Sequence, residues 1–242
     1  MDQDRSRLHP AFILHRRPYS NSSLLLECLT PEQGRFPAIA RGTLSGRAAT
    51  ASVLQPFRPL LIQTSGRGEV KTLTSVEADG RPVALQGEAL YCGFYLNELL
   101  MRLLGRFDPH PVLFSLYGSA LKGLPHREKR EHTLRQFELA LMTELGYGLL
   151  LEQEAETGLP IQPDVQYYYV LERGPSRNKV NEALPISGRS LLVLAGREPQ
   201  MGPGGWREAR ELMRHVLARY LGDHPLKSRE LFLSLQGKRH NE

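Results

Sequence analysis

The sequence predicts an α+β protein with two domains, an N-terminal five-stranded β-barrel followed by a mainly α-helical domain. Two observations predict this fold. Short apolar runs separated by turn residues fill the chain from about residue 9 to residue 79, and after Pro82 the spacing of apolar residues changes from about two to about 3.6. We therefore expect one domain at 1–80 and a second at 81–242, with a small strand insert near 165–187. The 242 residues are enough for two domains of ordinary size.

The barrel is predicted from strands and the breakers between them. Residues 24–29, 36–40 and 70–74 are short apolar or alternating runs, and residues 31–34 and 65–68 contain the proline and glycine typical of turns. About five strands fit into roughly 70 residues at this spacing. So short an all-β unit must close on itself to hide its edges, and a five-stranded OB-fold barrel fits that count.

The second domain is predicted from helical periodicity. Residues 90–104 place Leu90, Phe94, Asn97 and Leu100 on one face of a first helix. Further helices are expected at 111–124, 126–145, 206–221 and from 225 onward. A weaker segment between them, residues 167–171, is expected to be a strand that pairs with 183–186 across a turn at 177–178.

Composition limits the class of protein. With 40% hydrophobic and 24% charged residues, the chain is typical of a soluble globular protein. Residues 1–5 lack the basic start and apolar core of a secretory signal, so we expect a cytoplasmic location. Cys28 and Cys92 have no paired spacing, which favours two small buried side chains over a disulfide or a zinc site. The formal charge of +5 favours polyanionic partners.

The sequence offers no motif for catalysis. It contains no H-E-x-x-H or paired C-x-x-C metal pattern, no G-x-S-x-G elbow and no phosphate-binding glycine loop. Residues 202–205 are interpreted as a linker, residues 65–69 as a hairpin turn, and the acidic residues of 152–156 as a solvated face. We expect a protein without enzymatic activity. A nuclease that uses Glu69, Asp79 and Glu98 is the enzymatic alternative, and metal-dependent DNA cleavage would establish it.

The barrel region supplies what a single-stranded nucleic acid needs. OB barrels stack bases on exposed aromatic rings while basic residues follow the backbone. Phe36 and Phe57 are expected mainly in the barrel core, whereas Tyr19 lies in a polar turn, and the loop 41–47 is basic at both ends. The residues predicted to bind DNA are Arg16, Arg17, Tyr19, Arg35, Arg41, Arg47, Arg67 and Lys71.

Several segments, in this order, resemble one family of DNA repair proteins, the RecO family. They are residues 11–19, 54–61, 66–73, 95–100, 135–141, 145–148 and 225–231, and the similarity runs from about residue 9 to residue 235. The resemblance implies an OB-fold followed by a helical domain, and binding of single- and double-stranded DNA. It further implies annealing of complementary strands, and action with RecR to load RecA onto DNA coated by single-stranded-DNA-binding protein. It implies no cofactor and a cytoplasmic, nucleoid-associated location.

The resemblance also implies recognition of the C-terminal tail of single-stranded-DNA-binding protein. A tail that ends in an aromatic residue and a carboxylate requires an arginine beside an apolar groove. Arg135 beside the stripe of Leu134, Phe137 and Leu141 meets that description, and the basic residues Lys227 and Arg229 are the other candidates for partner binding.

Two departures from the family pattern limit what is carried over. Residues 149–176 contain no cysteine where some members hold a four-cysteine zinc site, so we expect no zinc. The loop after Ala40 is less basic than is usual in the family, which predicts weaker DNA affinity through that loop. The alternative function is a generic OB-fold single-stranded-DNA-binding protein, which would bind DNA without annealing or partner contact. A monomer is the expected oligomeric state.

Overall fold

The computed structural model describes residues 8–42, 52–222 and 224–232, and the chain packs into two compact units. Unit 1 comprises Met1–His126 together with Pro225–Glu242, and unit 2 comprises Arg127–His224. Unit 1 groups the barrel with the two helices that follow it, whereas the domain boundary predicted from the sequence falls at residue 80. The chain therefore leaves unit 1, forms unit 2, and returns to unit 1.

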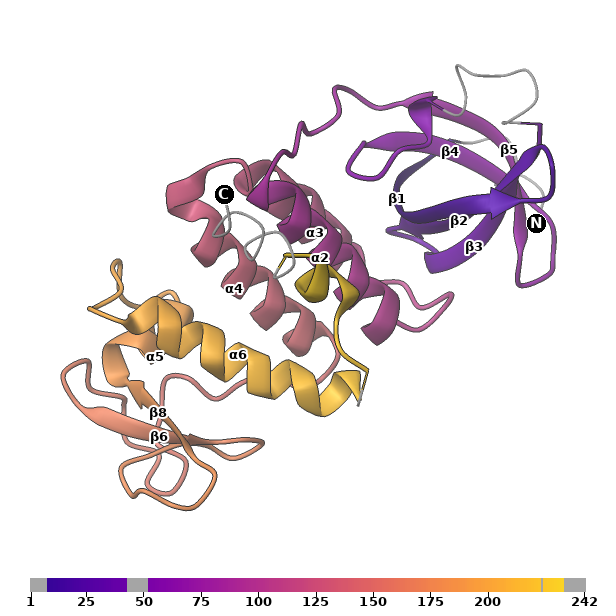
Figure 1. The fold of residues 1–242 in the computed structure, drawn as a ribbon. Helices are drawn as coiled ribbons and strands as arrows, with labels where there is room; N and C mark the ends of the chain where they lie inside the picture. Colours follow the sequence, from indigo (N-terminus) through magenta and orange to yellow (C-terminus); the bar gives the residue numbers. More distant parts are fainter. Residues whose placement is uncertain (1–7, 43–51, 223, 233–242) are drawn as a thin grey trace. The chain divides into compact units, whose positions relative to one another are not determined.

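Five strands of unit 1 close into a barrel (Figure 1) in the order β1-β2-β3-β5-β4. The strands are β1 (His9–Tyr19), β2 (Ser23–Thr30), β3 (Gly34–Ala40), β4 (Leu60–Ser65) and β5 (Lys71–Ala78). All neighbours pair antiparallel except β3 and β5, which pair in parallel at Ala38 with Lys71 and Ile39 with Thr72. The predicted five-stranded OB-fold barrel is confirmed.

Alternation along the strands fills the barrel. Ile13 of β1, Cys28 of β2 and Phe36 of β3 lie side by side in register, and all three side chains point into the same buried cluster. The register shifts between Ile13 and His15, so that Leu14 is the residue of a β-bulge. Phe36 lies in this core as predicted, whereas Phe57 is buried outside the cluster, with its ring 5.2 Å from that of Phe94.

Two helices of unit 1 pack on the barrel: α2 (Glu88–Leu103) and α3 (Pro111–Gly123), which begins at its proline as predicted. A buried polar chain fixes them. The Asn97 side-chain amide donates to the carbonyl oxygen of Leu14 at 2.8 Å, and the Tyr117 hydroxyl donates to Asn97 Oδ1 at 2.6 Å. The carbonyl that the bulge displaces thus receives its hydrogen bond from a helix.

The C-terminal part of unit 1 lies against α2. Residues 227–232 are helical, and the Glu98 carboxylate accepts hydrogen bonds from the backbone amides of Lys227 and Ser228 and from the Ser228 hydroxyl. Arg102 donates to the carbonyl oxygen of Pro225. An acceptor 130 residues away therefore satisfies the first amides of this helical turn.

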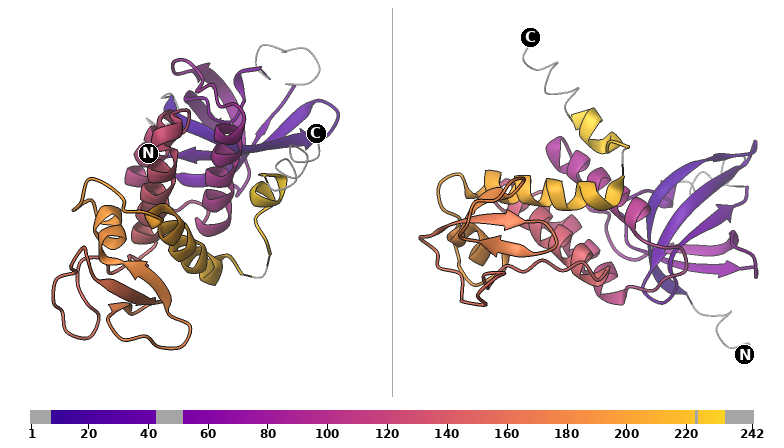
Figure 2. Two further views of the ribbon diagram at one scale, coloured as in Figure 1. Left: turned by 60° about the vertical axis from the view of Figure 1, so that its left-hand side comes forward. Right: turned by 90° about the horizontal axis from the view of Figure 1, so that it is seen from below.

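Unit 2 combines three helices with a small sheet. Its elements are α4 (Arg127–Glu144), β6 (Gln166–Val170), β7 (Gly174–Ser176), β8 (Leu184–Ser187), α5 (Gly188–Leu194) and α6 (Gly205–Leu221). The sheet order is β7-β6-β8, and Figure 2 shows α6 running beside this sheet. The predicted pairing of the two strand segments is confirmed by β6 and β8. The predicted simple turn between them is wrong, because β7 also pairs with β6.

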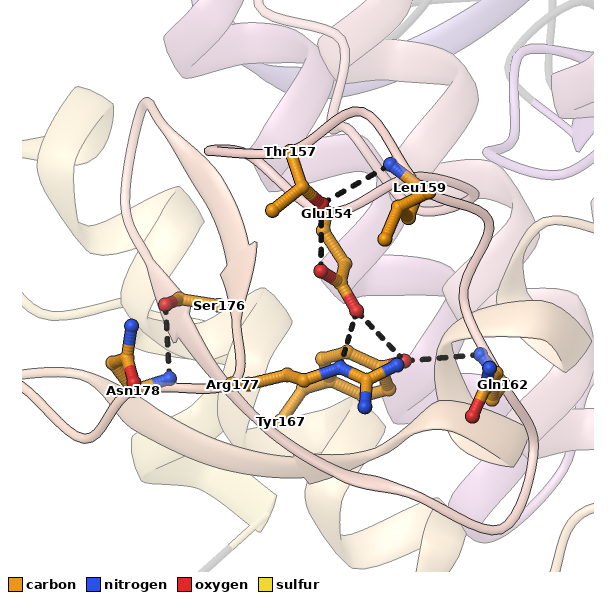
Figure 3. A network of polar contacts seen from close by, with 8 residues as sticks. All are labelled: Glu154, Thr157, Leu159, Gln162, Tyr167, Ser176, Arg177 and Asn178. Atoms are coloured by element: carbon orange, nitrogen blue, oxygen red, sulfur yellow. Dashed lines mark hydrogen bonds and ion pairs between the residues drawn. The ribbon is translucent and has the colours of Figure 1, made fainter.

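A buried carboxylate organises the loop before the small sheet (Figure 3). Glu154, 4% exposed, accepts hydrogen bonds from the Thr157 hydroxyl at 2.7 Å and from Arg177 Nε at 2.5 Å. These bonds from Thr157 and Arg177 lower the pKa of Glu154. Its predicted place on a solvated acidic face is therefore wrong, although Glu152 and Glu156 are exposed.

Candidate nucleic-acid interface

The positive charge of the chain is concentrated in unit 1. Unit 2 contains thirteen of the 31 lysines and arginines and fourteen of the 26 acidic residues, so its net charge is −1. The remaining eighteen basic and twelve acidic residues give unit 1 a net charge of +6. Because phosphates are attracted to uncompensated positive charge, unit 1 is the part of the chain that favours a nucleic acid.

One group of predicted DNA-binding residues gathers where β1 ends, β2 begins and β3 ends. Pro18 pairs with Leu24, and Leu24 pairs with Ala40, so the three strands reach this end of the barrel together. Tyr19 and Arg41, the next residues along their strands, are exposed at this end, with 49% of Tyr19 accessible.

The arginines of β1 differ in their surroundings. Arg17 is exposed and pairs with Leu25, whose side chain lies outside the buried barrel cluster. Arg16 pairs with the buried Leu26 and donates from Nη1 to the carbonyl oxygen of Leu54 at 3.3 Å. Arg17 is therefore the better placed of the two to reach a phosphate, because the guanidinium of Arg16 also binds the backbone of the barrel.

A second group lies at the β4–β5 hairpin and the start of β5. Arg67 is exposed in the hairpin, and Lys71 donates from Nζ to the carbonyl oxygen of Gly66 at 3.0 Å. Because Lys71 pairs with Ala38 and β5 runs parallel to β3, the hairpin projects toward the beginning of β3. The register therefore separates Arg67 and Lys71 from the group that contains Tyr19 and Arg41.

Arg35 has a structural role in the barrel. Its guanidinium donates to Glu27 at 3.0 Å and to the carbonyl oxygen of Leu104 at 2.9 Å, and 12% of its side chain is exposed. Arg35 therefore joins β3 to β2 and to the end of α2. The remaining predicted residue, Arg47, lies outside the described residues.

Exposed arginines of the chain differ in whether they form an ion pair. Among the described residues, no carboxylate forms an ion pair with Arg17, Arg41 or Arg67 of the barrel. By contrast, Arg197 of unit 2 pairs with Glu152 at 2.7 Å, and Arg219 of unit 2 pairs with Glu172 at 2.7 Å. Arg17, Arg41 and Arg67 are thus available to an added anion in a way that Arg197 and Arg219 are not.

The predicted partner-binding stripe is present on α4, but its side chains are buried. Leu134, Phe137 and Leu141 are 8%, 3% and 0% exposed, and Arg135 is 5% exposed with Nη2 bonded to Glu138 at 2.5 Å. The four residues do lie together, as the helical spacing requires, but burial leaves little of their side chains accessible to a partner. Lys227 and Arg229 are exposed, as a binding role requires.

Sequence reasoning missed one exposed aromatic ring, Phe107, in the segment between α2 and α3. It is 39% exposed, and Lys71 Nζ lies 5.3 Å from the centre of its ring. The predicted domain boundary assigned Phe107 to the helical domain and Lys71 to the barrel. Lys71 and Phe107 are distant in the sequence, and the periodicity of apolar residues gives no information about which distant residues come into contact.

The nuclease alternative concerns the acidic side chains of the chain. No group of three or more histidine, cysteine, aspartate or glutamate side chains in the described ranges is arranged to hold a metal ion. Glu98, one of the acids considered for a nuclease, binds the C-terminal segment instead. No helix in the described part of the chain has the length and apolar character needed to span a membrane.

Comparison with known families agrees with the barrel and the helices that follow it. Residues 6–80 match the family model "Recombination protein O N terminal", and residues 84–230 match "Recombination protein O C terminal". The chain belongs to the RecO family. The resemblance inferred from the sequence segments is thereby confirmed, as is the fold of an N-terminal barrel with a helical C-terminal region.

Curated relatives named "DNA repair protein RecO" match over nearly their whole length. The protein from Alkalilimnicola ehrlichii is 48% identical over 97% of this chain and 94% of its own. The protein from Nitrosococcus oceani is 47% identical over 95% and 94%, and that from Coxiella burnetii is 49% identical over 94% and 98%. The chain is thus a RecO-family DNA repair protein, and this role implies contact with DNA.

Proposed function

We propose that this protein is a recombination mediator that binds single- and double-stranded DNA through unit 1 and anneals complementary strands. With RecR, it helps to load RecA onto DNA coated by single-stranded-DNA-binding protein. The observation that carries the proposal is the full-length RecO-family match, together with a closed barrel whose exposed arginines belong to a unit of charge +6. The mediator makes and breaks no covalent bond, and it acts in the cytoplasm at the nucleoid.

The DNA-binding part is tested by fluorescence anisotropy with a labelled oligothymidylate at several salt concentrations. Arg17→Ala combined with Arg41→Ala removes two exposed cations from the barrel. The slope of log K against log salt is about −0.7 per phosphate contact for a single strand, so loss of two contacts should make it less negative by about 1.4. The control is Arg197→Ala, which removes an exposed arginine of unit 2 that is already paired with Glu152. An unchanged slope in the double variant would place the phosphate contacts elsewhere.

The mediator part is tested by annealing of complementary strands that are coated by single-stranded-DNA-binding protein. We expect annealing to accelerate with the wild-type chain and to require the C-terminal tail of the coating protein. If the chain binds bare DNA but anneals neither bare nor coated strands, the generic single-stranded-DNA-binding function becomes the better account.

Recognition of the tail by Arg135 is tested with a labelled tail peptide and the same peptide amidated at its C-terminus. Because Arg135 is buried against Glu138, Arg135→Ala alone also leaves a buried carboxylate without this ion pair. The matched variant is Glu138→Gln, which weakens the same ion pair but keeps the arginine. Loss of peptide binding in Arg135→Ala with retention in Glu138→Gln would assign the carboxylate contact to Arg135. Equal loss in both variants would instead indicate a disturbed helix α4.

A further inference from the structure

Phe107 is held in an unusual way at the surface of unit 1. Its backbone φ is 57°, in the left-handed region that a bulky residue rarely occupies, and its amide donates to the carbonyl oxygen of Arg35 at 2.9 Å. Its ring stacks on the barrel residue Phe36 with ring centres 5.9 Å apart and planes inclined by 10°. The backbone and Phe36 together fix the orientation of a ring that remains 39% exposed.

One cation lies over this ring. Lys71 Nζ is 5.3 Å from the ring centre, and the hairpin before Lys71 carries the exposed Arg67, whereas the neighbouring Arg106 is paired with Glu27 at 2.9 Å. The carboxylates nearby are partly engaged, since Glu27 bonds to both Arg35 and Arg106 and Asp108 lies 3.3 Å from His110. A fixed, exposed aromatic ring beside a lysine is an arrangement that can stack a nucleobase and bind its phosphate.

We propose that Phe107 is a stacking platform for an unpaired base of single-stranded DNA, and that Lys71 moves from the ring to the adjacent phosphate. The inference rests on the proposed function, because it needs DNA to bind unit 1. It adds a second aromatic contact to that of Tyr19. Tyr19 and Phe107 lie toward opposite ends of β3, since Tyr19 is near Ala40 in the register and Phe107 is bonded to Arg35. At about 3.3 Å per residue, the six steps from Arg35 to Arg41 span roughly 20 Å, which a few nucleotides of single-stranded DNA can bridge.

The experiment places a fluorescent indole at the proposed platform. Trp206 is the one tryptophan of the chain, so Trp206→Phe gives a background without tryptophan emission. Phe107→Trp in this background is titrated with unlabelled oligothymidylate, and we expect strong quenching as thymine stacks on the indole. The matched control is Phe94→Trp, because Phe94 belongs to the same unit and is similarly exposed at 38%. We expect no comparable quenching at position 94.

A second variant measures the contribution to affinity. Phe107→Leu keeps an apolar side chain over Phe36 but removes the stacking ring, and we expect oligothymidylate binding to weaken about 5- to 100-fold. Unchanged thermal unfolding of this variant shows that the barrel is intact. Saturable binding by anisotropy with no quenching at position 107 would overturn the platform while leaving the proposed function standing. Absence of any binding by the wild-type chain would overturn both. The same variant is also titrated with the tail peptide of single-stranded-DNA-binding protein. Quenching by this peptide but not by DNA would assign the ring to a protein partner and refute the proposal.

Discussion

Replacing Asn97 by leucine should destabilise unit 1 far more than the loss of one surface amide would. Asn97 is 3% exposed and connects the bulged Leu14 carbonyl to the Tyr117 hydroxyl, which is itself fully buried. Leaving a buried polar group without its hydrogen bond costs about 1–3 kcal/mol, so loss of both bonds should lower the free energy of unfolding by about 2–6 kcal/mol. Domains of this size have total stabilities of about 5–15 kcal/mol, so the effect is a large fraction of the whole.

A double-mutant cycle isolates the polar chain from changes in packing. Tyr117→Phe removes the hydroxyl that Asn97 accepts from, so Asn97→Leu with Tyr117→Phe should be less destabilised than the sum of the single variants, by about 1–2 kcal/mol. Hydrogen–deuterium exchange of peptides from β1 and α3 reports the opening of unit 1, while peptides from α6 of unit 2 serve as an internal control. Additive effects, or a loss of protection equally large in unit 2, would refute the coupling between Asn97 and Tyr117.

Three other predictions follow from buried or distant contacts. Because hydrogen bonds from Thr157 and Arg177 lower the pKa of Glu154, their contribution to stability is complete above the unfolded-state pKa and is lost as pH falls through the folded-state value. Glu154→Gln should therefore flatten the acid side of the thermal stability profile, and an unchanged profile would contradict the assignment. Burial, with a smaller effect of Glu27, raises the pKa of the Cys28 thiol to about 12. A thiol reagent at pH 8 should therefore label Cys28 only after unfolding. Labelling of Cys28 in the folded chain, mapped by mass spectrometry, would disprove this. Glu98→Ala should release the turn that begins at Lys227, seen as faster amide exchange of residues 227–232 with the barrel unchanged, whereas retained protection there would show that Glu98 is dispensable.

The barrel could be predicted from the sequence because its determinants are local. Alternating apolar residues and turn-forming breakers specify strands, and a short all-β segment has few ways to hide its edges. The short helix α5 was not predicted, because its seven residues are too few for a helical period to stand out. The position of residues 227–232 on α2 was not predictable either, since it depends on hydrogen bonds to Glu98 across about 130 residues.

Candidate site residues were harder to predict than strands because their roles depend on contacts between distant residues. The exposure of a residue can be predicted from the local sequence pattern. The partner of a charged side chain, however, depends on how distant parts of the chain fold together. Arg35 and Arg17 look equivalent in the sequence, yet Arg35 is bonded to Glu27 and Leu104 whereas Arg17 is exposed. The buried pair of Arg135 and Glu138 likewise could not be distinguished from two solvated charges on α4.

The proposed binding of DNA by unit 1 depends on how compensated and uncompensated charges are distributed over the chain. A cation that already pairs with a carboxylate must lose that partner before it binds a phosphate, so its net contribution to DNA affinity is small. Arg197 and Arg219 of unit 2 are such cations, whereas Arg17, Arg41 and Arg67 of the barrel have no ion pair among the described residues. The formal charge of +5 therefore understates the attraction of unit 1 and overstates that of unit 2.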